Sequence, residues 1–166
     1  MWLLTKEIQP GERRWIVGPT YRQLKSTTWP VLRQVLRQWD GARINESDLS
    51  IKLPNDAEIA LKGAEQENNL RGAGLDMVVM EEFSYIKPHV YEEIIYPMLT
   101  TTQGETLFIG TPNSFDHLYD YYLRGQSDPE WKSWQFTTLE GGFVPGDEIE
   151  RAKATMDEPT FKTEFL

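Results

Sequence analysis

The sequence contains no cysteine and only two histidines, His89 and His117. The absence of cysteine excludes a disulfide framework and any metal site built on thiolates. Neither histidine has a partner at a metal-ligand spacing, so both are expected to have surface or helix-capping roles. The usual cysteine- and histidine-based metal centres are therefore not expected here.

Long hydrophobic runs and positive charge are also scarce. No stretch approaches the roughly 18 to 20 apolar residues that a membrane-spanning helix needs, and residues 1–8 are too short and too charged for a signal peptide. The 17 Lys and Arg stand against 26 Asp and Glu, for a formal net charge of −9. A basic nucleic-acid-binding module is not indicated. A DNA motor is not excluded, because a local basic strip or a separate domain could contact the phosphates. We expect a soluble intracellular protein.

The residues that are present suit a folded core. Of 166 residues, 39% are hydrophobic and 12% are aromatic. This length and composition predict a single domain over residues 1–166 with one core. No internal repeat or low-complexity segment interrupts it.

The most informative stretch runs from Leu75 to Phe83. Its apolar run, residues 77–80, is short and contains adjacent valines, which is typical of a strand buried on both faces of a parallel sheet. The run ends in two carboxylates, Glu81 and Glu82. In open α/β sheets the functional residues lie beyond the carboxyl ends of the strands. An acidic pair there can hold Mg²⁺ and polarise a water molecule, as the Walker B motif of P-loop ATPases does. The alternative is a strand that ends in a solvated Glu-Glu turn.

The rest of the chain alternates between strand and helix patterns. Further strands are predicted at 15–17, 106–109 and 134–138, and a β-hairpin at 49–53 and 57–61 with a three-residue loop. Helices are predicted at 2–8, 21–39 with a break at Pro30, 88–98, 115–123, 148–156 after a cap at Asp147, and from about 159 onward. This alternation predicts an α/β fold with a mainly parallel sheet flanked by helices. Polar residues then follow three strands at one rim, namely Pro19-Thr20, Glu81-Glu82 and Thr111 to Asn113.

Several segments, taken in order, resemble the ATPase domain of the large terminase subunit of tailed bacteriophages. They are Trp15-Ile-Val-Gly-Pro-Thr-Tyr-Arg-Gln-Leu-Lys-Ser-Thr-Thr-Trp-Pro, Leu70-Arg-Gly, Val78-Val-Met-Glu-Glu, Phe108-Ile-Gly-Thr-Pro-Asn, Trp134-Gln-Phe-Thr-Thr and Phe161-Lys-Thr-Glu-Phe-Leu. The resemblance covers nearly the whole chain. It implies a P-loop-ATPase-like fold and, in the complete protein, ATP-driven translocation of DNA into the procapsid.

The resemblance also implies roles for individual residues. Glu82 matches the catalytic carboxylate that orients and deprotonates the attacking water, and Glu81 matches a position, usually Asp, that supports Mg²⁺. Thr111 and Asn113 lie in the coupling motif, which senses the γ-phosphate, and Gln23 lies in a segment near the nucleotide. Arg71 could neutralise a phosphate or a carboxylate near the rim, or it could form a structural salt bridge; these alternatives stay open. The implied ligands are ATP and Mg²⁺.

The sequence departs from the family pattern in two places. It contains no Gly-x-x-x-x-Gly-Lys-Ser/Thr loop, the segment that does most of the triphosphate binding, and no acidic cluster for a nuclease follows. We therefore expect an N-terminally truncated, partial ATPase domain that is inactive by itself, and whether this chain is an enzyme stays open. A non-enzymatic remnant or interaction module is one alternative. A fragment of another P-loop motor, such as a helicase, is a second. The resemblance further implies double-stranded DNA, portal and small terminase subunit as partners, a homo-oligomer, no membrane and the host cytoplasm.

Overall fold

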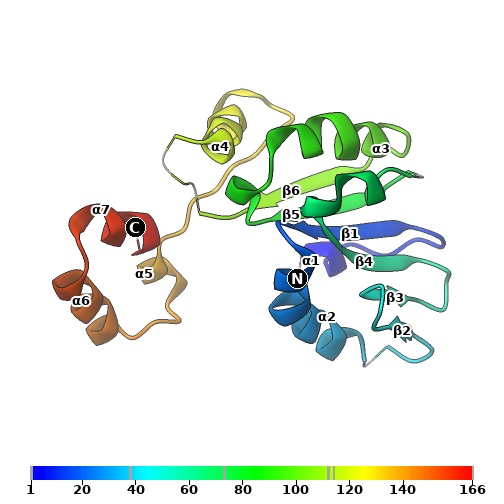
Figure 1. Cartoon of the computed structure of the whole chain (residues 1–166), viewed down its shortest axis with the longest axis horizontal. Helices are drawn as coiled ribbons and strands as arrows, with labels where there is room; N and C mark the ends of the chain where they lie inside the picture. The colour runs from blue at the N-terminus through cyan, green and yellow to red at the C-terminus, as the bar shows by residue number, and fades with distance from the viewer. Residues whose placement is uncertain (1, 38, 73, 112, 114, 166) are drawn as a thin grey trace. The chain divides into compact units, whose positions relative to one another are not determined.

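The computed structural model describes residues 2–37, 39–72, 74–111, 113 and 115–165. The chain divides into two compact units, Met1–Ile109 and Gly110–Leu166. The first unit contains the sheet and the second is helical (Figure 1). Among the described residues, no helix is long and apolar enough to cross a membrane.

The sheet has six strands in the order β2-β3-β4-β1-β5-β6. β1 pairs in parallel with β4 and β5, and β5 pairs in parallel with β6, whereas β2, β3 and β4 are antiparallel neighbours. The predictions of a mainly parallel sheet and of a hairpin are confirmed, and β2 is an additional strand. The strands are β1 (Arg13–Gly18), β2 (Arg43–Asn45), β3 (Ser50–Lys52), β4 (Glu58–Gly63), β5 (Met77–Glu81) and β6 (Glu105–Ile109).

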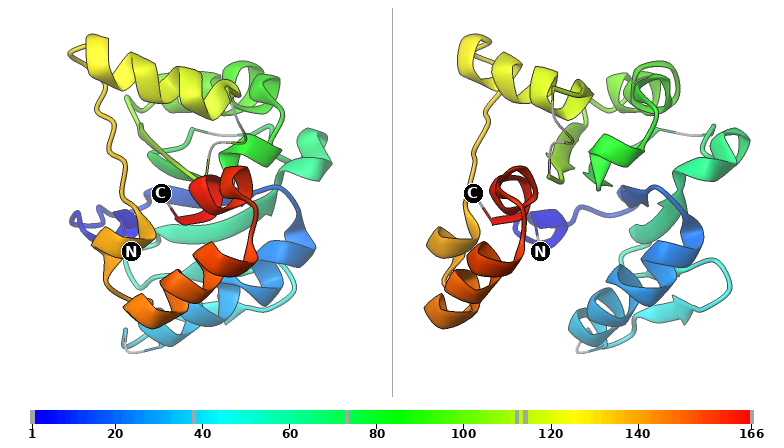
Figure 2. Two further views of the ribbon diagram at one scale, coloured as in Figure 1. Left: turned by 90° about the vertical axis from the view of Figure 1, so that its left-hand side faces the viewer. Right: turned by 60° about the vertical axis from the view of Figure 1, so that its left-hand side comes forward.

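Helices cover both faces of this sheet (Figures 1 and 2). One face packs its apolar side chains against η1, α1 and α2 in a continuous core. The opposite face carries η4 and α3, whose inward residues are also buried. The helical segments of the first unit are η1 (Trp2–Leu4), α1 (Tyr21–Ser26), α2 (Thr28–Leu36), η2 (Ala64–Asn69), η3 (Phe83–Tyr85), the π-helical η4 (Val90–Ile95) and α3 (Tyr96–Thr100).

The predicted helix at 21–39 breaks earlier than expected. α1 ends at Ser26 and α2 begins at Thr28, whereas Pro30 lies inside the first turn of α2. A proline is tolerated there because the amide that it lacks would have no partner within the helix. The predicted break at Pro30 is therefore wrong, and the break lies at Thr27. The predicted helix at 2–8 is reduced to η1.

The second unit contains four helices among its described residues: α4 (His117–Ser127), α5 (Thr138–Gly141), α6 (Gly146–Thr155) and α7 (Glu158–Phe165). The strand predicted at 134–138 is wrong. Trp134 and Phe136 are 63% and 77% exposed, and no described strand pairs with them. Thr137 and Glu140 instead form a reciprocal capping box that starts α5. Asp147 lies within the first turn of α6 and not at its cap.

β6 is the least covered of the parallel strands. The residues of β1 and β5 are almost all buried, whereas those of β6 are half-buried or exposed, and Ile109 is 48% exposed. Within the described sheet β6 has only one neighbour, β5. The described strands form one continuous sheet, and β6 is the parallel strand at its edge. A further parallel strand could therefore pair beside β6. An apolar strand with an unpaired edge can template pairing with another chain.

We therefore expect the 166-residue chain to self-associate through β6. An Ile109→Lys substitution should shift the protein toward monomer, because a charge on an edge strand opposes strand pairing. Sedimentation velocity across a range of concentrations measures this. Val35→Lys is the matched control, since Val35 is similarly exposed at 44% but lies on α2. Monomeric behaviour of the unsubstituted chain at all concentrations would contradict the expectation.

Candidate active site

The carboxyl ends of β1, β5 and β6 lie at one rim of the sheet, because the three strands are parallel neighbours. At β1 the chain passes through Gly18 into α1, where the Thr20 hydroxyl caps the helix by accepting from the Gln23 amide at 3.2 Å. A Cβ at Gly18 would lie 2.8 Å from Leu24 Cδ2. Glycine thus allows α1 to pack closely against the end of β1.

Glu82 occupies a left-handed turn immediately after β5. Its backbone has φ 52° and ψ 47°. Residues other than glycine adopt this conformation at a cost of roughly 1–2 kcal/mol. Its carbonyl accepts from the Tyr85 amide at 2.9 Å, which closes the turn. The side chain is half-buried, and among the described residues no group hydrogen-bonds to its carboxylate. Backbone strain of this kind concentrates at functional sites.

The next residue, Phe83, anchors the turn. Its side chain is fully buried, and its ring lies 4.5 Å from that of Phe108 on β6 and 6.3 Å from that of Tyr91 on η4. Tyr91 and Phe108 meet edge-on at 4.7 Å. Aromatic pairs at these distances add stability beyond the area that they bury. The cluster joins the segment after β5 to β6 and so holds Glu82 at the rim.

Glu81 points to a different neighbour. The Thr28 hydroxyl, at the first residue of α2, lies 2.7 Å from Glu81 Oε2 and 3.0 Å from Oε1. The carboxylate is therefore next to the amino terminus of a helix, where a negative charge is stabilised. Of these two adjacent carboxylates, that of Glu81 is held by Thr28, whereas that of Glu82 has no partner among the described residues.

A second group of contacts fixes the segment that follows Glu82. The Glu67 carboxylate on η2 accepts from Lys87 Nζ at 3.1 Å and contacts His89 Nε2 at 2.9 Å. The hydrogen bonds from His89 and then Lys87 lower the pKa of Glu67 below its usual value. The Glu65 carboxylate accepts from the Tyr21 amide at 2.8 Å at the start of α1. Together these contacts connect η2 to the start of α1 and to the segment that follows η3.

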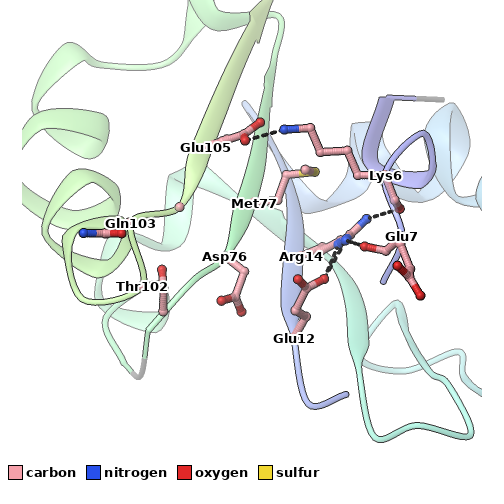
Figure 3. Close-up of a pocket in the computed structure, with 10 residues that line it drawn as sticks. Lys6, Glu7, Glu12, Arg14, Asp76, Met77, Thr102, Gln103 and Glu105 are labelled. Atoms are coloured by element: carbon pink, nitrogen blue, oxygen red, sulfur yellow. Dashed lines mark hydrogen bonds and ion pairs between the residues drawn. The ribbon is translucent and has the colours of Figure 1, made fainter. Parts of the chain in front are cut away.

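A half-open pocket of about 210 Å³ lies at the other end of the parallel strands, around the starts of β1, β5 and β6 (Figure 3). Arg14, only 2% exposed, donates there to the Glu12 carboxylate and to three backbone carbonyls of the amino-terminal segment, those of Leu3, Lys6 and Glu7. All its guanidinium nitrogens are engaged, so Arg14 anchors this segment to the sheet. The pocket is separate from the acidic rim.

Comparison with known proteins identifies the family. The model of the phage terminase large subunit family matches residues 3–159. The chain belongs to this terminase family. The large terminase subunits of Thermus phage G20c and of Thermus virus P23-45 are each 30% identical to it over 136 residues, which is 70% of this chain and 28% of each relative. The chain therefore spans less than a third of the length of these relatives.

Solved terminase structures share the fold. The large terminase ATPase domain of Thermus phage P74-26 superimposes with a TM-score of 0.81 at 23% identity, covering 94% of this chain and 76% of that domain. The large terminase of a thermophilic bacteriophage, in complex with ADP, gives a TM-score of 0.76 at 16% identity, covering 99% of this chain and 42% of that one. The same bacteriophage protein is known in complex with ATP-γ-S. The predicted terminase-type α/β fold is confirmed.

The terminase fold distributes the predicted site residues over several elements. Glu81 and Glu82 end β5 at the rim, and Gln23 is exposed on α1. Arg71 is exposed just after η2 and has no ion-pair partner among the described residues, which disfavours the structural salt bridge. Thr111 and Asn113 follow β6 and belong to the second unit, where the Asn113 amide donates to the Asp116 carboxylate at 2.8 Å. Pro112, between them, lies outside the described residues.

The acidic pair has the right chemistry for Mg²⁺ but does not form a metal cluster alone. Across the described chain, no three carboxylate or histidine side chains come together as a metal-binding group. Mg²⁺ is usually held by one or two carboxylates together with water and substrate phosphates. Glu81 retains acceptor capacity beyond its bond to Thr28, since an ionised carboxylate has about four lone-pair sites. Both carboxylates therefore keep oxygens that a cation could contact.

Sequence reasoning missed Thr28, Glu65 and Glu67. Thr28 lies 53 positions from Glu81, and no spacing rule connects the two. Its only signal was its place in the segment that follows β1 in the family resemblance. The contacts of Glu65 and Glu67 depend on the position of η2, which the sequence left as helical or irregular.

The strain at Glu82 predicts a gain in stability when the side chain is removed. Glu82→Gly should raise the free energy of unfolding by about 1 kcal/mol, because glycine adopts positive φ without steric cost. Glu81→Gly is the control and should lower it, because Glu81 lies in a strand and bonds to Thr28. Urea denaturation measures both values. A loss of stability in Glu82→Gly would show that the turn is not strained.

Proposed function

We propose that the chain is part of the ATP-hydrolysing motor of a phage DNA-packaging terminase, with Glu82 as the residue that activates the attacking water. The observation that carries this proposal is the strained turn at the end of β5. It presents a carboxylate with no partner in the described chain at the rim where α/β enzymes bind ligands. Membership in the terminase family and the nucleotide-bound structures of the thermophilic bacteriophage terminase support it.

The chemistry assigned to Glu82 is general-base catalysis of phosphoryl transfer. Its carboxylate would orient a water molecule and accept its proton while the water oxygen bonds to the γ-phosphorus and the bond to the ADP oxygen breaks. When bound, Mg²⁺ neutralises charge on the phosphates. Glu81 would hold it together with phosphate oxygens and water.

Three further roles are proposed for residues outside the acidic pair. Thr111 and Asn113, which follow β6, would sense the γ-phosphate and couple hydrolysis to movement. Gln23 on α1 would lie near the nucleotide. Arg71 is exposed and without a carboxylate partner in the described chain, so it is available to a phosphate.

The partners proposed for the complete protein follow from the family. Double-stranded DNA is the translocated substrate, and the portal and the small terminase subunit are the assembly partners, with several copies of the large subunit forming the motor in the host cytoplasm. The net charge of −9 argues that any DNA contact in these residues is a local basic strip and not the whole surface.

A non-enzymatic role is the second candidate for these 166 residues by themselves. The sequence contains no glycine-rich Lys-Ser/Thr loop, and those amides and that lysine do most of the triphosphate binding. Without them the chain could still pack against other packaging subunits. The helicase alternative is set aside, because the family match spans residues 3–159.

We expect residues 1–166 alone to hydrolyse ATP negligibly and to bind it with a dissociation constant of about 1 mM or weaker, corresponding to roughly −4 kcal/mol. In a terminase polypeptide that joins these residues to a phosphate-binding loop, turnover should appear. Glu82→Gln should then reduce it by about 10²-fold or more. An ATP-binding titration and steady-state phosphate release measure these effects.

Glu93→Gln is the control in that polypeptide, since Glu93 is an exposed carboxylate on η4. Two results would contradict the proposal. One is robust turnover by residues 1–166 that Glu82→Gln abolishes, because the phosphate-binding loop would then be unnecessary. The other is a longer polypeptide whose turnover survives Glu82→Gln.

A further inference from the structure

The contact between Thr28 and Glu81 has a geometry that bears on cation binding. The hydroxyl oxygen of Thr28 lies at nearly equal distances, 2.7 and 3.0 Å, from the two carboxylate oxygens. The contact is partly buried and joins the first residue of α2 to the last residue of β5. A single group at such distances from both oxygens lies between them, on the open side of the carboxylate.

The proton in this contact comes from Thr28. A threonine hydroxyl has one proton, and an ionised carboxylate only accepts. The neighbouring Thr27 hydroxyl lies 3.3 Å from that of Thr28 but donates its own proton to the Gln23 carbonyl at 2.9 Å. Thr28 therefore shares its proton between Oε1 and Oε2 of Glu81, and Thr27 has a different partner. This difference provides a matched control one residue away.

We propose that Thr28 is a positioning residue that determines how Glu81 meets a divalent cation. The side of a carboxylate between its two oxygens is the side that a bidentate cation occupies. Because the Thr28 hydroxyl is already there, Glu81 is left with the outer lone pair of each oxygen. It can then contact a cation through one oxygen, or through a bridging water, but not through both oxygens at once.

The consequence is selectivity between cations, which deepens the proposed function and rests on it. Ca²⁺ accepts bidentate carboxylates and high coordination numbers, whereas Mg²⁺ keeps several waters and uses one or two carboxylates with substrate phosphates. Blocking the bidentate side disfavours Ca²⁺ and leaves the Mg²⁺ mode intact. Glutamate at this position, one methylene longer than the aspartate expected from the family, extends the carboxylate toward Thr28.

The test measures cation binding to the 166-residue chain and requires no turnover. Mg²⁺ and Ca²⁺ are titrated separately, and binding is followed through the shift of the Glu81 amide signal in NMR spectra. The same titrations of Glu81→Gln measure the shift that does not depend on the Glu81 carboxylate. We expect Thr28→Ala, which removes the hydroxyl and leaves no atom in its place, to raise the Ca²⁺/Mg²⁺ affinity ratio about tenfold, within the range known for groups that orient metal ligands. Thr28→Ser and Thr27→Ala should keep the ratio of the unsubstituted chain.

A purely structural role for Thr28 would lower stability without changing the ratio. Glu81→Asp provides a second route if Thr28→Ala does not fold, because the shorter side chain withdraws from Thr28 and should also raise the ratio. An unchanged ratio in the folded variants, a Thr28→Ser protein that behaves like Thr28→Ala, or no Glu81-dependent cation binding would each overturn the inference. None of these outcomes affects the assignment of Glu82, which is tested by turnover.

Discussion

Parallel pairing of β5 between β1 and β6 is the constraint on which the rest of the structure depends. Its register sets Val17 beside Met80 and Glu81 beside Ile109, so the carboxyl ends of the three strands lie together. Backbone bonding and burial on both faces fix β5 up to its last residue. The chain must then turn away from the rim in one step, and that step is the left-handed conformation of Glu82.

This constraint gives two adjacent carboxylates different environments. Glu81 still belongs to the strand and extends toward α2, where Thr28 binds it. Glu82 lies beyond the strand, and its strained backbone is retained because Phe83 is locked into the aromatic cluster behind it. A carboxylate bound by the fold is suited to supporting a cation. One without a partner in the described chain is suited to accepting a proton, and the function that we propose uses both features.

The sequence predicts five of the six described strands, all but β2, because each of those five has a strong local signal. The apolar run at 77–80, the alternation in the hairpin and the polar residues after each strand were sufficient for the sheet and for the acidic pair. The strand at 134–138 was mispredicted because strand-like composition has no consequence without a pairing partner, and the Thr137–Glu140 capping box favours a helix start. The contact of Thr28 with Glu81 and the sign of φ at Glu82 are tertiary features. They arise from strand order and from the burial of Phe83, which no short sequence window contains.

The fold itself, without nucleotide or metal, holds Glu82 in a left-handed turn. The most direct measurement is the backbone φ of Glu82 in the nucleotide-free chain in solution, from NMR scalar couplings and the intraresidue amide-to-Hα distance. We predict a positive φ near the 52° of the structure. A negative φ, with Glu82 continuing the extended conformation of β5, would contradict it, because the carboxylate would then depend on ligand binding for its position at the rim.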